Sequence, residues 1–136
     1  MKYDSQTLQI IGLFEKITRA KLKDIVMQDD KYIFIVEEGE YTKALGKDLK
    51  NLKKLNTMLG SKIKIVEFKK DVQNFIKNLI YPLKPDSIEI MDDIAAIKSQ
   101  DTKTKGLLIG SRAKNLRFYE SVVQNYFKEI KEIKVI

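Results

Sequence analysis

The segment KALGKDLKNLKKL, residues 43–55, contains the pattern around which the predicted fold is built. Sixty-four positions later the chain carries LLIGSRAKNLRFY, residues 107–119, and both segments share the pattern Gly-x-x-x-Lys-Asn-Leu-Lys/Arg. Chance would not place this pattern at the same point of two matching halves, so the match indicates an internal repeat. We call residues 46–49 (GKDL) the first loop and residues 110–113 (GSRA) the second loop.

Each segment predicts two helices that meet at a glycine, because glycine lets the backbone turn sharply and approach another backbone closely. Asp48 and Ser111 are the predicted N-caps of the helices that follow the two loops. The start of such a helix offers free N–H groups and the positive end of the helix dipole, here beside several lysines. Each segment therefore predicts a site that could bind a phosphate group.

The first half of the chain predicts three helices and three strands. Apolar residues at helical spacing, Leu8, Ile11, Phe14 and Ile17, mark the buried face of the first helix, and Ile10 and Leu13 widen this face. Two β-branched and aromatic runs on either side of Asp29 and Asp30 predict a hairpin. The predicted elements are a helix at residues 7–20, strands at 21–27 and 32–36, helices at 41–45 and 49–59, and a strand at 62–68.

The second half repeats this order. Its predicted elements are a helix at residues 69–81, strands at 87–91 and 94–98, helices at 105–109 and 113–128, and a strand at 132–136. The fold class is therefore α/β, with two tandem domains at residues 1–67 and 68–136. Each domain has the order α-β-β-α-α-β, with a three-stranded sheet covered on one face by helices.

Composition narrows the function. The 136 residues are 43% hydrophobic and 33% charged, which is typical of a soluble globular protein. Cysteine and histidine are absent, which removes thiol nucleophiles, imidazole bases and the usual zinc ligands. We therefore expect no enzyme activity, no cofactor and no metal site. The N-terminal residues MKYDSQTLQI lack the apolar core of a signal peptide, so we expect a cytoplasmic protein. The net charge of +7 suits an anionic partner.

Two consecutive α-β-β-α-α-β units, each with a glycine turn between its second and third helices, resemble tandem KH domains of the prokaryotic (type II) arrangement. The two loops lie where that family has its GXXG loop, which holds the backbone of nucleic acid. From about residue 7 to the last residue, the chain is similar to the family of archaeal NusA-like transcription factors. The resemblance implies binding of single-stranded nascent RNA in transcription termination or antitermination, with RNA polymerase as a further candidate partner.

The resemblance also implies which residues contact RNA. They are Gly46, Lys47, Lys50 and Asn51 in the first unit and Gly110, Ser111, Arg112, Lys114 and Asn115 in the second. Both loops depart from GXXG in the last position, where Leu49 and Ala113 stand instead of glycine. Leucine is the larger obstacle to an approaching phosphate, and Asp48 adds a negative charge. The second loop is therefore expected to bind more strongly.

An alternative stays open, in which the KH units are degenerate and form a protein-interaction scaffold that docks on RNA polymerase or ribosomal partners. A helix–glycine–helix corner is also an ordinary structural element, and lysines on an amphipathic helix usually form its solvated face. Tyr41, Phe118 and Tyr119 could stack on bases, but aromatic residues at helical spacing are more often part of the core. The pairs Asp29-Asp30 and Asp92-Asp93 fit hairpin turns better than a metal site.

Overall fold

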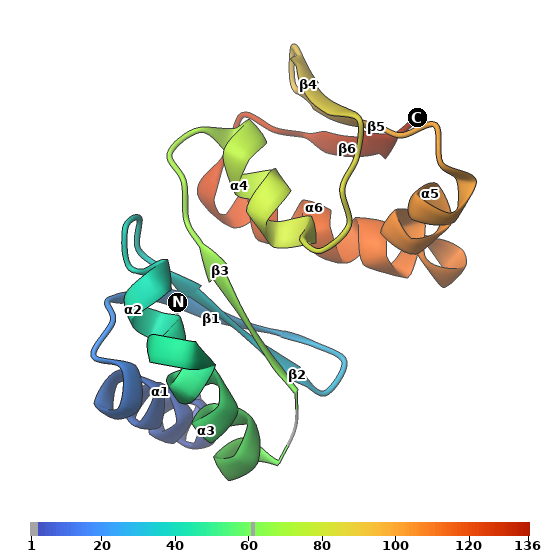
Figure 1. Ribbon diagram of the computed structural model, residues 1–136. Helices are drawn as coiled ribbons and strands as arrows, with labels where there is room; N and C mark the ends of the chain where they lie inside the picture. Colours follow the sequence, from blue (N-terminus) through green and yellow to red (C-terminus); the bar gives the residue numbers. More distant parts are fainter. Residues whose placement is uncertain (1–2, 61) are drawn as a thin grey trace. The chain divides into compact units, whose positions relative to one another are not determined.

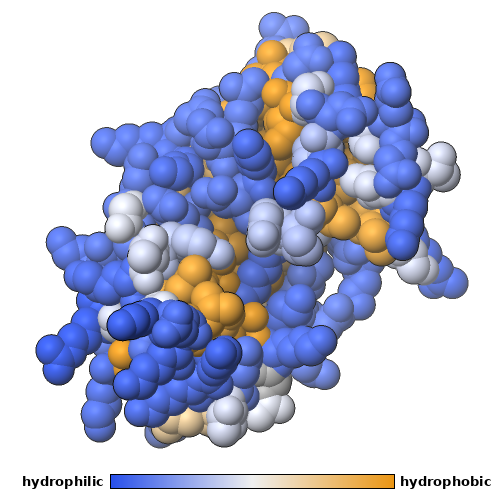
Figure 2. All heavy atoms as spheres, in the orientation of Figure 1, coloured by the Kyte–Doolittle hydropathy of each residue, from blue (hydrophilic) through white to orange (hydrophobic). Residues whose placement is uncertain are grey.

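The computed structural model describes residues 3–60 and 62–136, which divide into two compact units, Met1–Phe68 and Lys69–Ile136 (Figure 1). Each unit has the element order α-β-β-α-α-β, with the helices on one face of a three-stranded sheet. The predicted fold class, two tandem type II KH domains, is thereby confirmed. Hydrophilic residues cover most of the face drawn in Figure 2. Among the described residues, no helix combines the length and apolar character that crossing a membrane requires.

The first unit is built around a sheet in the order β1-β2-β3. Strands β1 and β2 are antiparallel neighbours, and β3 runs parallel to β2. A 3₁₀ turn, Lys47–Leu49, separates the second and third helices. The helices are α1 (Ser5–Thr18), α2 (Tyr41–Leu45) and α3 (Lys50–Leu59), and the strands are β1 (Leu22–Gln28), β2 (Lys31–Val36) and β3 (Ile63–Glu67).

The second unit has the same topology, with the sheet order β4-β5-β6 and β6 parallel to β5. A 3₁₀ turn, Ser111–Ala113, again separates the second and third helices. The helices are α4 (Val72–Ile80), α5 (Thr102–Ile109) and α6 (Lys114–Tyr126), and the strands are β4 (Ser87–Met91), β5 (Ile94–Lys98) and β6 (Glu132–Val135).

The last helix of each unit fixes the position of the last strand through one side chain. In the first unit Ile63 N–H donates to Asn56 Oδ1 at 2.9 Å, and in the second Ile133 N–H donates to Glu120 Oε2 at 2.9 Å. Asn56 and Glu120 both stand at the seventh position of their helices. The two acceptors therefore set the start of β3 and β6 in the same way, although α6 is the longer helix.

The core of the first unit lies between α1, α3 and the sheet. Phe14 of α1 and Phe34 of β2 are fully buried and stack with their ring centroids 4.3 Å apart. The predicted inward position of Leu8 is wrong, because this side chain is 55% exposed. The buried residues of α1 are Ile10, Phe14 and Thr18, a four-residue spacing that turns Leu8 towards solvent.

Several helices begin earlier or later than predicted because aspartate side chains cap them. Asp4 accepts from Thr7 N–H at 2.7 Å, so α1 starts at Ser5 and not at residue 7. Asp101 accepts from Thr104 N–H at 3.1 Å, so α5 starts three residues before the predicted position. Asp71 caps α4, which runs from Val72 and not from residue 69. In each case an N-cap supplied the missing hydrogen bond acceptor.

The stacked phenylalanine pair leads to a prediction about stability. Phe14→Ala should lower the free energy of unfolding by about 3–5 kcal/mol, because it leaves a cavity against Phe34. Leu8→Ala on the same helix should change it by less than about 0.5 kcal/mol, because Leu8 is exposed. Urea unfolding followed by circular dichroism measures both, and similar losses from the two variants would contradict the observed orientation of α1.

Candidate functional site

The two loops adopt the same backbone conformation, starting with glycine. Gly46 has φ 78° and ψ 166°, and Gly110 has φ 75° and ψ 172°. This combination of positive φ and extended ψ is open almost only to glycine. The backbone conformation therefore requires the glycine at the start of each loop.

Two consecutive left-handed residues follow in each loop. Asp48 has φ 55° and ψ 32°, and Arg112 has φ 55° and ψ 33°. The next residues, Leu49 and Ala113, have φ 61° in both loops. The left-handed conformation costs about 1–2 kcal/mol per non-glycine residue. Each loop thus keeps a strained geometry that a glycine in its last position would adopt more readily.

The predicted N-caps are wrong in both loops. Asp48 and Ser111 lie inside the 3₁₀ turns, and the residues at the cap position are Leu49 and Ala113, which make no side-chain cap hydrogen bond. A side-chain cap requires an extended cap residue, whereas both residues here are left-handed. Helices α3 and α6 therefore start without a cap hydrogen bond to the side chain of their own N-cap residue, and their first N–H groups donate to the carbonyls of Lys47 and Ser111.

The repeated asparagines hold the helix corners together. Asn51 Nδ2 donates to the Lys43 carbonyl at 3.1 Å, and Asn115 Nδ2 donates to the Leu107 carbonyl at 2.8 Å. A Cβ atom added to Gly46 or Gly110 would lie 2.8 Å from the asparagine side chain and 3.0 Å from its backbone nitrogen. Both asparagines were predicted to contact RNA, and the structural hydrogen bond that each one makes was not predicted. The shared spacing of eight residues between donor and acceptor was its only signal.

The charged and hydroxyl side chains predicted to bind RNA are exposed, each at the loop of its own unit. Lys47 and Lys50 are exposed in the first unit, and Ser111, Arg112 and Lys114 are exposed in the second. Within residues 3–60 and 62–136, neither Lys47 nor Arg112 has an ion-pair partner. Both charges are thus available to an anion. Leu49 is 44% exposed at the tip of the first loop.

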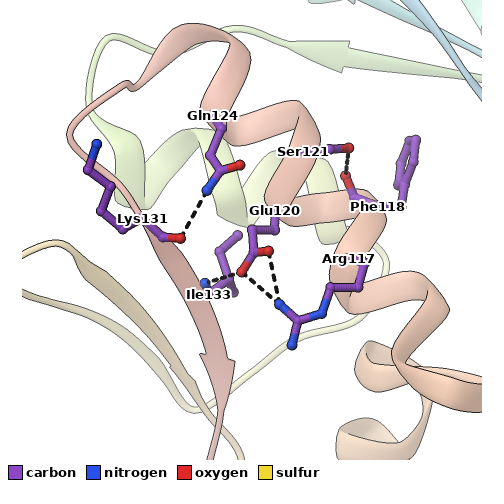
Figure 3. A network of polar contacts seen from close by, with 7 residues as sticks. All are labelled: Arg117, Phe118, Glu120, Ser121, Gln124, Lys131 and Ile133. Atoms are coloured by element: carbon purple, nitrogen blue, oxygen red, sulfur yellow. Dashed lines mark hydrogen bonds and ion pairs between the residues drawn. The ribbon is translucent and has the colours of Figure 1, made fainter.

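A network of polar contacts anchors α6 behind the second loop (Figure 3). Arg117 donates through one nitrogen to both oxygens of Glu120, at 2.9 and 3.1 Å. The same Glu120 carboxylate accepts from Ile133 N–H of β6, and Gln124 Nε2 donates to the Lys131 carbonyl at 3.0 Å. The second loop therefore precedes a helix that is hydrogen-bonded to the last strand of the sheet.

The aromatic residues belong mainly to the core. Tyr119 is only 8% exposed, and burial raises the pKa of its hydroxyl. Tyr41 packs against the core of the first unit, and Phe118 is half-buried with its ring centroid 5.9 Å from that of Tyr119. Tyr119 is therefore a core residue, whereas Tyr41 and Phe118 remain partly exposed within their own units.

The acidic pairs lie at the hairpin turns. Asp29 and Asp92 have φ 55° and 56° at the turns between paired strands, which supports the turn interpretation. In the described residues no group of three or more carboxylates could hold a metal ion. Hydrogen bonds from the Thr104 hydroxyl and N–H lower the pKa of Asp101, which caps the helix leading into the second loop.

Comparisons with known proteins point to one group of relatives. No protein-family model matches the sequence. A protein of Methanocaldococcus jannaschii named probable transcription termination protein NusA is 30% identical over 100% of this chain and 75% of its own length. Proteins of the same name from Methanococcus vannielii and Thermoplasma acidophilum are 29% and 25% identical, over 85% and 91% of this chain and 69% and 88% of their own lengths.

One solved structure supports the fold. The crystal structure of a protein named APE1850 superposes with a TM-score of 0.70 at 27% identity and covers 95% of this chain and 96% of its own.

The loop geometry predicts that two exchanges in the second loop affect stability to different extents. Gly110→Ala should lower the free energy of unfolding by about 1–3 kcal/mol, because alanine resists this conformation and its methyl group meets Asn115. Ala113→Gly should leave it within about 1 kcal/mol of the original value, because relief of the left-handed strain offsets the greater freedom of the unfolded chain. Chemical unfolding measures both variants, and equal stability of Gly110→Ala and the unchanged protein would contradict the requirement for glycine.

Proposed function

The chain belongs to the family of archaeal NusA proteins, and we propose that it acts there as a non-enzymatic, cytoplasmic factor that binds single-stranded nascent RNA. The proposal places it in transcription termination or antitermination, with RNA polymerase as protein partner. Each of the two units, Met1–Phe68 and Lys69–Ile136, supplies one RNA-binding KH domain. The observation that carries the proposal is the pair of loops with one backbone geometry, each exposing basic side chains beside the start of a helix.

The second loop offers the better set of phosphate ligands. Arg112 contributes a planar, permanently charged group that fits two phosphate oxygens, and Ser111 contributes a hydroxyl donor. The N–H groups of Ala113 and Lys114 already donate to the carbonyls of Gly110 and Ser111, so the loop side chains supply the contacts to a phosphate. The helix dipole of α6 adds a positive potential at the same place.

The first loop offers a weaker set. Lys47 and Lys50 supply two charges, but Asp48 lies between them and carries the opposite charge. Leu49 replaces the methyl group of Ala113 by a branched side chain that is exposed at the loop tip. An RNA backbone would meet this side chain where glycine would leave room. The second unit therefore contributes most of the affinity in this proposal.

The difference between the loops can be tested by charge reversal. Arg112→Asp should weaken binding of single-stranded RNA far more than Lys47→Asp, because the second loop holds the phosphate more fully. Ala113→Gly should change the affinity little, whereas Leu49→Gly should strengthen the first site by removing the obstruction. Fluorescence anisotropy at one fixed salt concentration measures all four variants.

A matched control is Lys128→Asp, which makes the same change of charge beyond the far end of α6. It separates loss of a specific contact from loss of overall positive charge. Equal losses from Arg112→Asp and Lys128→Asp would refute a site at the second loop. No loss from either loop variant would favour the scaffold function, in which the units dock on proteins.

Salt dependence gives a second test. Each phosphate neutralised on a single strand contributes a slope of about −0.7 in log K against log salt. We expect RNA affinity to fall steeply with salt, and Arg112→Gln to reduce the size of the slope by about 0.7, which is one phosphate contact. Titrations over a series of salt concentrations measure this. Binding that ignores salt, or that favours duplex DNA over single-stranded RNA, would contradict the proposal.

A further inference from the structure

The asparagine after each loop points backwards, to the helix before the loop. Asn51 and Asn115 are the second residues of α3 and α6, and their acceptors, Lys43 and Leu107, are the third residues from the ends of α2 and α5. The last carbonyl groups of a helix lack partners within that helix. Each asparagine therefore caps the C-terminal end of the entering helix and links it directly to the helix that leaves the loop.

The asparagine side chain also packs against the glycine at the start of its loop. The space where a Cβ of Gly46 or Gly110 would stand is taken by the asparagine Cγ and Nδ2 atoms, both 2.8 Å away. The corner is thus held by a hydrogen bond on one side and by close packing on the other. Both contacts recur in the two units, although the residues between the glycine and the following Lys-Asn differ at all three positions.

We infer that Asn51 and Asn115 are positioning residues, which hold the loops in their RNA-binding conformation while the basic side chains make the phosphate contacts. This inference rests on the proposed function. Two left-handed residues follow each glycine and favour relaxation of the loop. A corner locked before RNA arrives avoids the cost of ordering the loop on binding.

The direction of the hydrogen bond explains why asparagine occupies the position. Its Nδ2 donates to a carbonyl oxygen, whereas an aspartate of the same shape would place a carboxylate oxygen against that carbonyl. Alanine would remove the bond and leave the glycine without its packing partner. Asn115→Asp and Asn115→Ala should therefore both release the corner, for different reasons.

Hydrogen exchange of the 136-residue chain reports the conformation of the second loop directly. Gly110 N–H donates to the Gly106 carbonyl at 2.8 Å and Ala113 N–H donates to the Gly110 carbonyl at 3.2 Å, so both amides report the closed corner. In Asn115→Ala and Asn115→Asp these amides should exchange faster, while buried amides of β5 stay protected. RNA affinity should fall by about three- to tenfold, the equivalent of one lost hydrogen bond.

Two comparison variants make the result specific. Asn125→Asp adds the same charge at an exposed position of α6 and should leave the exchange of the loop unchanged. Arg112→Gln should reduce RNA affinity and its salt slope while the loop amides keep their protection. A positioning residue and a contact residue are thereby told apart, because only the first changes the loop in the absence of RNA.

Each outcome decides the inference. Faster loop exchange together with weaker RNA binding in the Asn115 variants supports it. Weaker binding with unchanged exchange would make Asn115 an RNA contact, and faster exchange with unchanged affinity would make the corner irrelevant to binding. If Asn115→Ala loses protection in β5 as well, Asn51→Ala in the first unit takes its place. If the unchanged protein binds no RNA, the proposed function fails together with the inference, which sets this case apart.

Discussion

The close packing of asparagine on glycine at each helix corner is the contact on which the rest of each unit depends. It allows the chain to reverse between α2 and α3, and between α5 and α6, without a longer connection. The reversed helix then carries Asn56 or Glu120 to the start of the last strand. That strand pairs in parallel with the middle one, and the helices provide the crossover connection that a parallel pair requires.

A comparison of the two units shows which residues of the helix corner can change without changing its backbone. The loop backbones agree closely, yet one carries Lys-Asp-Leu and the other Ser-Arg-Ala. A rigid corner allows such exchanges, because side chains at the loop tip are not needed for packing. Between the loop glycine and the shared Lys-Asn, all three positions that differ lie where the proposed ligand would be met.

The sequence predicted the repeat, both hairpins, the short helix α2 and the glycine turns, because these features have strong local patterns. The sequence-based prediction failed where a single tertiary contact decides where a helix starts or which side chain is buried. The acceptors Asp4, Asp71 and Asp101 moved helix starts, and the buried face of α1 excluded Leu8. The left-handed pair after each glycine could not be foreseen, because leucine and alanine rarely adopt that conformation alone. The hydrogen bonds of the two asparagines depend on this left-handed geometry, so the sequence alone did not predict them.

The bond from the last strand to the last helix has a consequence for solubility. A strand at the border of a sheet presents unpaired N–H and C=O groups, and these can template pairing with strands of other molecules. Asn56 and Glu120 take up the outward N–H groups of Ile63 and Ile133 at such borders. One polar side chain per unit thus removes a donor that would otherwise invite aggregation when many copies are made.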